Sequence, residues 1–177
     1  MKILNLHGYR GEAANSVFNA MIELGYDVIS PQIDYDSITP KKLLKDMLEL
    51  YDRNDCGAVV GTSAGGFFAS QICVIKKCPV VLINPCLLSF VYLPRLGYNN
   101  QSGILEYMSM FSAVSGINKE LVTVIVGEED EIIDSHDFTK LLFPKCISVP
   151  NGKHSGPTLP LKDIFEQKQL LLDISNL

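Results

Sequence analysis

The sequence is poor in the residues that mark several classes of protein. It contains no tryptophan, three histidines and five cysteines. The cysteines are scattered, and none forms a Cys-x-x-C pair: Cys56, Cys73, Cys78, Cys86 and Cys146. Because zinc sites need closely spaced thiolates or imidazoles, we expect no metal, and nothing else in the sequence requires a cofactor. Free buried thiols fit a reducing cytosol.

Basic clusters and long apolar runs are also missing. Lys and Arg number 15 against 20 Asp and Glu, a formal net charge of -5, and form no run. Since phosphate binding needs clustered cations, we expect no nucleic-acid partner. The longest apolar stretch, Cys86–Leu93, is far shorter than the ~20 residues that cross a bilayer. Polar residues interrupt Met1–Gly8, so we expect no signal peptide. The sequence predicts a cytoplasmic protein and leaves the oligomeric state open.

Short apolar runs alternate with longer helical patterns along the whole chain. The length of 177 residues and the 47% hydrophobic content predict one globular domain, residues 1–177. Runs rich in Val, Ile and Leu predict six strands: Lys2–Leu6, Asp27–Ser30, Ala58–Thr62, Val80–Asn84, Leu121–Val126 and Cys146–Val149. Amphipathic patterns predict five helices between or after them: Glu12–Leu24, Pro40–Tyr51, Ala64–Ile75, Asp134–Leu142 and Leu159–Ile174. This alternation favours a parallel sheet covered on both faces, a three-layer α/β/α architecture.

One connection is much longer than a crossover requires. Pro85–Glu120 is rich in Leu, Phe, Tyr and Met. Long segments inserted between sheet elements are often lids or binding loops, so we expect a lid or an apolar acyl pocket here. The alternative is a pair of ordinary surface helices that pack on the sheet.

The strongest chemical signal is Gly61-Thr62-Ser63-Ala64-Gly65-Gly66, between a predicted strand and a predicted helix. A G-x-S-x-G sequence in this setting forms a nucleophile elbow, which exposes Ser63 above the carboxyl edge of the sheet. The amide of Ala64 then faces the position where an oxyanion develops. A phosphate-binding loop is disfavoured because Phe67-Phe68, and not Lys-Ser/Thr, follow.

A serine nucleophile needs a base, and the hydrolase chain order Ser…Asp/Glu…His limits the choice. Of the three histidines, His136 and His154 follow Ser63. His154 lies in a glycine-flanked loop after the last predicted strand, whereas His136 falls within a predicted helix. We therefore predict His154 as the base.

The acid is predicted among four consecutive carboxylates that follow the fifth strand. Asp130 is best placed, because the run leaves the strand through a glycine and re-enters an apolar stretch two residues later. Glu128, Glu129 and Asp134 remain alternatives. The end of the preceding strand, another position for the acid in hydrolases, holds Asn84, which carries no charge.

The second oxyanion donor is expected from the loop after the first strand. In Leu6-His7-Gly8-Tyr9, the glycine allows the backbone to turn and the amide of Tyr9 can face a substrate. His7 is then expected to support the loop and not to act as a base.

Together these motifs, with Asn84-Pro85 and Gly152-Lys153-His154, resemble those of α/β-hydrolases. More narrowly, the set is similar to the small bacterial esterases of the YqiA type. The resemblance implies a reduced hydrolase sheet in the order 2-1-3-4-5-6, without the two N-terminal antiparallel strands. It also implies the triad and the oxyanion donors given above. The loop departs from these relatives at Arg10, which could favour an anionic substrate or pair with Glu12.

These observations predict a serine hydrolase that cleaves a small-molecule carboxylic ester through an acyl-enzyme, with Ser63, Asp130 and His154 as its triad. The same triad would also serve a thioesterase or a small-amide hydrolase. An alternative outside enzymology is a hydrolase fold kept as a binding module with an idle site.

Overall fold

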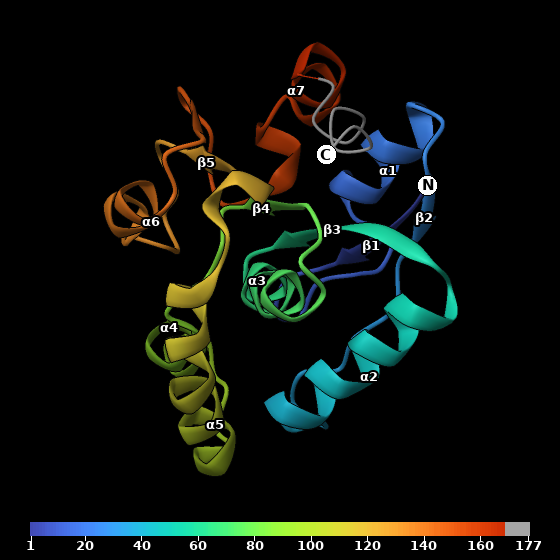
Figure 1. Cartoon of the computed structure of the whole chain (residues 1–177). Coiled ribbons are helices and arrows are strands. Elements are labelled where there is room, and N and C mark those ends of the chain that lie inside the picture. Colours follow the sequence, from blue (N-terminus) through green and yellow to red (C-terminus); the bar gives the residue numbers. More distant parts are fainter. Residues whose placement is uncertain (169–177) are drawn as a thin grey trace.

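Six parallel strands form a single sheet in the computed structural model, which describes residues 1–168 (Figure 1). Their order is β2-β1-β3-β4-β5-β6, which confirms the predicted fold class and strand order. The strands are β1 (Lys2–Leu6), β2 (Asp27–Ile29), β3 (Cys56–Thr62), β4 (Val80–Ile83), β5 (Val122–Gly127) and β6 (Cys146–Val149). Because all six are parallel, their carboxyl ends and the loops that follow them meet at one edge.

Helices cover both faces of this sheet. They are α1 (Ser16–Glu23), α2 (Pro40–Arg53), α3 (Ala64–Lys76), α4 (Ser89–Arg95), α5 (Gln101–Phe111), α6 (His136–Leu142) and α7 (Leu161–Lys168). Helices α1 and α7 lie together on one face, and α2, α3 and α5 lie on the other (Figure 1). None of the helices in residues 1–168 is both long enough and apolar enough to cross a bilayer.

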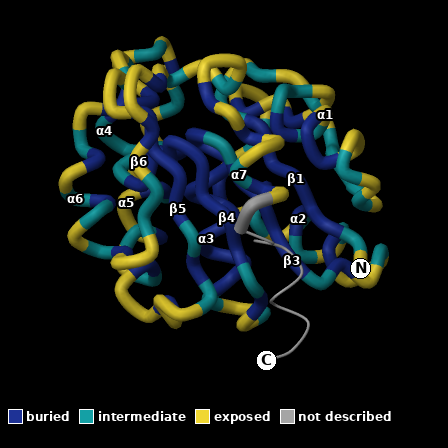
Figure 2. The backbone as a smooth tube through the Cα atoms, turned by 90° about the horizontal axis from the view of Figure 1, so that it is seen from above, coloured by how far each residue is buried: buried dark blue, intermediate teal, exposed yellow. Residues whose placement is uncertain are grey.

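The alternation of side chains along β1 divides the core into two layers. Leu4 and Leu6 pack into the larger cluster, under α2 and α3, whereas Ile3 packs into the smaller cluster, under α1 and α7. All three side chains are fully buried. Successive residues of a strand face opposite sides of a sheet, so an apolar run is required where both sides are covered. Figure 2 shows the resulting buried sheet beneath partly exposed helices.

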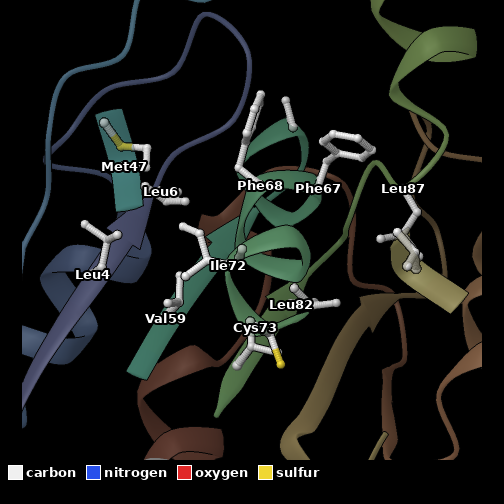
Figure 3. Packing of buried hydrophobic residues seen from close by; sticks show 14 of the residues in the cluster. Leu4, Leu6, Met47, Val59, Phe67, Phe68, Ile72, Cys73, Leu82 and Leu87 are labelled. Atoms are coloured by element: carbon white, nitrogen blue, oxygen red, sulfur yellow. The ribbon is translucent and has the colours of Figure 1, made fainter. Parts of the chain in front are cut away.

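Helix α3 is the central helix of the larger layer and directly follows Ser63. Its residues from Ala64 to Cys73 are all buried, in keeping with its apolar sequence. Phe67, Phe68 and Ile72 pack among side chains of the sheet and of the neighbouring helices (Figure 3). This packing fixes the start of the helix and therefore the position of the serine that precedes it.

Most of the predicted helices and strands are present, but several begin or end at residues other than the predicted ones. The first helix begins at Ser16 and not at Glu12, because the side chain of Asn15 caps it by accepting a hydrogen bond from the Phe18 amide at 2.8 Å. The last helix begins at Leu161, and its predicted continuation through residues 169–174 lies outside the described residues.

The segment 85–120 forms two helices and two short 3-10 turns, Ser112–Gly116 and Lys119–Leu121. Helices α4 and α5 lie side by side (Figure 1). From this segment, Tyr98 and Tyr107 contact the aromatic rings of Tyr9, Phe67 and Phe68, with edge-to-face geometry. Through the contact between Tyr98 and Tyr9, this segment packs against the loop that follows β1.

Candidate active site

Ser63 has the strained backbone that a nucleophile elbow requires. Its φ and ψ angles are 52° and -120°, a conformation that residues with a side chain rarely adopt. The backbone around it holds this conformation. Its amide donates to the Ile83 carbonyl at 3.0 Å, and its carbonyl accepts from the amides of Gly66 and Cys86, each at 2.9 Å. Since such strain costs about 1–3 kcal/mol, these bonds and the burial of α3 must maintain it.

Two glycines allow the elbow to approach the end of β1. A Cβ on Gly65 would lie 2.1 Å from the Leu6 carbonyl oxygen, which is impossible without a backbone shift. A Cβ on Gly8 would lie 3.0 Å from the Cβ of Ser63 and 3.5 Å from its hydroxyl. The loop after β1 therefore lies directly against the serine side chain.

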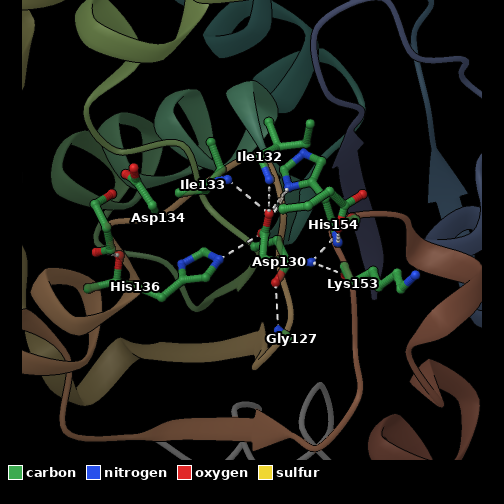
Figure 4. Close-up of polar contacts among 12 residues, drawn as sticks. Gly127, Asp130, Ile132, Ile133, Asp134, His136, Lys153 and His154 are labelled. Carbon is green, nitrogen blue, oxygen red and sulfur yellow. Dashed lines mark hydrogen bonds and ion pairs between the residues drawn. The ribbon is translucent and has the colours of Figure 1, made fainter.

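His154 is held by the acid predicted for it. Its Nδ1 lies 3.0 Å from Oδ1 and 2.9 Å from Oδ2 of Asp130 (Figure 4). An ionised carboxylate only accepts hydrogen bonds, so this nitrogen carries a proton and Nε2 is left to act as a base. The histidine side chain is 18% exposed. The other candidate acids, Glu128, Glu129 and Asp134, are exposed to solvent.

Asn84, the uncharged residue at the end of β4, connects the two loops that carry His154 and Asp130. Its side-chain amide donates to the carbonyls of Lys153 at 2.9 Å and His154 at 3.2 Å. Its side-chain oxygen accepts from the Gly127 amide at 2.8 Å. The residue is fully buried. An aspartate here would lose both donated bonds, so this position needs an amide for structural reasons.

The Asp130 carboxylate is almost completely enclosed, with a side chain 1% exposed. Oδ1 accepts from the backbone amides of Ile132 and Ile133, each at 2.9 Å. Oδ2 lies 2.7 Å from Nε2 of His136. Burial raises the pKa of the Asp130 carboxyl, but hydrogen bonds from His136, His154 and Ile133 outweigh it and hold the pKa well below its ordinary value. The group therefore stays ionised at neutral pH.

His136 is the contact that sequence reasoning missed. Its position in a predicted helix argued against a role as the base, but no sequence pattern indicated that its ring would face the acid. The signal that could have found it is spacing: His136 begins α6, six positions after Asp130, and the turn between them returns its side chain to the carboxylate.

Ser63 and His154 line one cavity of about 260 Å³. Its other walls come mainly from the loop after β1, the start of α1 and the loop after His154: His7, Gly8, Tyr9, Gly11, Glu12, Asn15, Ser16, Val17, Thr62, Ser155, Gly156 and Pro157. The hydrogen bonds within residues 1–168 do not include one between the Ser63 hydroxyl and His154. No residue of the segment 85–120 lines this cavity, so the expected acyl pocket in that segment stays a prediction.

The two amides expected to bind an oxyanion belong to the residue after Ser63 and to the loop that lies against it. Ala64 is the first residue of α3, where amides have no acceptor within the helix. The Tyr9 amide follows Gly8, which lies against Ser63, and it donates to no group in the described part of the chain. Tyr9 also packs against Tyr35 and Tyr98, which hold this loop in place.

His7 supports the same loop, as expected. Its Nδ1 donates to the Gly8 carbonyl at 2.7 Å, and its Nε2 accepts from the Ile33 amide at 2.8 Å. The ring is fully buried, and this burial lowers the pKa of His7. A neutral ring with both nitrogens engaged cannot also serve as a base.

Arg10 does not line the cavity and pairs with Asp36 instead of Glu12, and the expected preference for an anionic substrate stays a prediction. Its guanidinium lies 3.7 Å from Asp36, donates to the Leu96 carbonyl at 3.3 Å and stacks on the Tyr9 ring. The charged side chain that does line the cavity is Glu12, which is exposed and makes no ion pair within residues 1–168. In the same residues, no cluster of three or more His, Cys, Asp or Glu is arranged to hold a metal ion.

Comparison with known sequences gives a family match across most of the chain. The model of the Uncharacterised protein family (UPF0227) matches residues 2–155. Among curated proteins, no sequence matches this chain.

Solved structures that this chain resembles in fold include hydrolases. MGS-MChE2, an alpha/beta hydrolase enzyme from a lagoon-sediment metagenome of Mar Chica, Morocco, shares 15% identity over 100% of this chain and 92% of its own, with a TM-score of 0.67. The esterase domain of a Rhodothermus marinus protein shares 13% identity over 92% of this chain and 80% of its own, with a TM-score of 0.64. A marine microorganism esterase shares 15% identity over 96% and 94%, with a TM-score of 0.57. At these identities the similarity establishes the α/β-hydrolase fold alone.

Proposed function

Because the chain belongs to the UPF0227 family and has the α/β-hydrolase fold, we propose that it is a serine hydrolase acting on carboxylic esters. Ser63 is the nucleophile, His154 the general base and Asp130 the acid that orients it. The single observation that carries this proposal is the bond between His154 and the buried Asp130, in a histidine that lines the same cavity as Ser63.

The reaction follows from the roles of these groups. The Ser63 hydroxyl attacks the ester carbonyl carbon as His154 Nε2 takes its proton, and the carbonyl oxygen becomes an oxyanion that accepts from the amides of Tyr9 and Ala64. The intermediate collapses, and His154 returns the proton to the departing alcohol. Water, deprotonated by His154, then attacks the acyl-enzyme and releases the acid and a free Ser63. Asp130 stays ionised throughout and stabilises the imidazolium that forms twice.

A fluorophosphonate probe tests this proposal directly. Fluorophosphonates react with serine hydroxyls that a neighbouring base activates, so we expect the probe to modify Ser63 in the folded protein. Peptide mass spectrometry identifies the modified serine. We expect His154→Ala to slow labelling strongly, because the hydroxyl then has no base. Labelling of the wild type elsewhere, or labelling of Ser63 at the same rate without His154, would contradict the proposal.

The cavity also predicts a preference for short acyl chains. Its volume of about 260 Å³ is below the usual range of ligand pockets, and Val17 and Pro157 are the aliphatic side chains among its lining residues. Lengthening the acyl group of a p-nitrophenyl ester from acetate to octanoate should therefore leave kcat/KM level or lower it. An acyl pocket formed by the segment 85–120 would instead raise kcat/KM with chain length, because each buried methylene contributes roughly 0.8 kcal/mol. The series thus decides between the two sites.

A further inference from the structure

His136 makes a contact that the proposed mechanism does not use. Its side chain is 10% exposed, and its Nε2 lies 2.7 Å from Oδ2 of Asp130. Since the carboxylate only accepts hydrogen bonds, His136 donates from Nε2. Its other ring nitrogen, Nδ1, is buried and has no partner among the described residues. The bond to Asp130 is therefore the one hydrogen bond that this ring makes within the described residues.

The donors to Asp130 are divided between its two oxygens. Oδ1 accepts from the amides of Ile132 and Ile133, and Oδ2 accepts from His136. His154 Nδ1 lies almost equally far from both, at 3.0 and 2.9 Å. Figure 4 shows the carboxylate between the two imidazoles. Without His136, Oδ2 would keep His154 as its one donor among the described residues, and the amides at Oδ1 would have to hold the carboxylate plane.

We propose that His136 is a positioning residue of this site: its Nε2–H fixes the Asp130 carboxylate and limits its attraction for a protonated His154. Loss of this donor would leave more charge on the Asp130 oxygens and strengthen their attraction for a protonated His154. A donated hydrogen bond withdraws charge from a carboxylate, and a carboxylate with less charge on its oxygens stabilises a neighbouring cation less. The significance of this role for catalysis rests on the proposed function, but the role itself does not.

Other charged groups also face His136. Together with Asp130, it lines a cavity of about 210 Å³ whose other charged side chains come from the turn between β5 and α6 and from α6 itself: Glu128, Asp134, Asp137 and Lys140. Of these, Glu128, Asp134 and Asp137 are exposed to solvent, so water screens their charge. Asp134 also accepts a hydrogen bond from Tyr92 and lies near Arg95. None of them makes a hydrogen bond to the His136 ring. A substitution of His136 therefore changes the direct partner of Asp130 and leaves these surrounding charges unchanged.

Nitrogen NMR of the wild-type protein tests the contact without any substitution. The chain has three histidines. His7 and His154 donate from Nδ1, whereas His136 donates from Nε2. With nitrogen-15 histidine at a pH above the histidine titrations, we expect two rings protonated at Nδ1 and one, His136, protonated at Nε2. An Nδ1-protonated His136 would overturn the proposal.

Two variants then test the effect on His154. His136→Gln keeps a donor near the position of Nε2, whereas His136→Leu removes it and keeps the side-chain bulk. Following the Cε1–H resonance of His154, we expect the titration midpoint to move upward by about 0.5–1 pH unit in His136→Leu. The midpoint should stay near the wild-type position in His136→Gln. An unchanged or lowered midpoint in the leucine variant, or equal shifts in both, would overturn the proposal.

These readouts separate this inference from the proposed function. If the wild type hydrolyses no ester, the histidine tautomers and the titration of His154 can still be measured. These two measurements then support or overturn the positioning role. If ester hydrolysis is present, the acid side of its pH profile should move with the NMR midpoint in His136→Leu and stay in place in His136→Gln. If the leucine variant does not fold, the glutamine variant decides. A shifted His154 midpoint in His136→Gln overturns the proposal. An unshifted midpoint, together with an Nε2-protonated His136 in the wild type, supports it.

Discussion

Ser63→Ala should lower kcat for a chromogenic acyl ester by about 10⁶-fold, the scale seen when a triad nucleophile is removed. Alanine keeps the Cβ but has no hydroxyl to attack the carbonyl. The same Cβ also keeps the backbone strain of position 63, where φ is 52°. We therefore expect Tm to change little, because the elbow bonds to Ile83, Gly66 and Cys86 involve only backbone atoms of Ser63. A steady-state assay with the chromogenic ester measures kcat, and a thermal melt measures Tm.

The chain offers a matched control for this variant. Ser155 is an exposed serine that lines the same cavity as Ser63 but lies in a loop and has no strained backbone. Ser155→Ala should keep kcat within about threefold of the wild type. A large loss of kcat in Ser155→Ala, with activity retained in Ser63→Ala, would show that Ser63 is not the nucleophile. A large loss of Tm in Ser63→Ala would mean that its hydroxyl has a structural role that the hydrogen bonds do not show.

The fold could be predicted because its signals are local. Each strand is an apolar run of Val, Ile and Leu, and burial on both faces of a parallel sheet demands such a run. The positions of Ser63, Asp130 and His154 at one edge follow from the same rule, since all three come directly after parallel strands or in the loops that follow them. Helix ends were less predictable. Glu12 looked helical in sequence, but the Asn15 side chain caps the helix three residues later.

The contacts that complete the site depend on tertiary structure. In the sequence, Asn84 is notable only as a position without charge, whereas in the structure its side-chain amide joins the loops of Gly127 and His154 through three hydrogen bonds. His136 reaches Asp130 only because α6 starts where it does. Sequence patterns report burial and backbone conformation. They contain no information about which polar side chain across a loop completes a buried carboxylate.

Asp130→Asn is expected to lower kcat by up to ~10⁴-fold. Hydrogen bonds hold the pKa of the Asp130 carboxyl well below its ordinary value, so the substitution removes a full negative charge at every pH near neutrality. It also disturbs the tautomer of His154. An asparagine amide that turns its NH₂ toward Nδ1 requires that nitrogen to accept, which moves the imidazole proton to Nε2, where the base must be free.

Two neighbouring carboxylates provide the controls for Asp130→Asn. Glu128 and Glu129 belong to the same acidic run but are exposed and make no bond to His154. Glu128→Gln and Glu129→Gln should keep kcat within about threefold, because a charge in water contributes little across this distance. If kcat fell ~10³-fold or more in either glutamine variant while Asp130→Asn stayed active, Asp130 would not be the acid. We expect kcat to fall in Asp130→Asn alone. This result follows if Asp130 is the acid because two imidazoles and two backbone amides enclose it, and not because it belongs to a run of carboxylates.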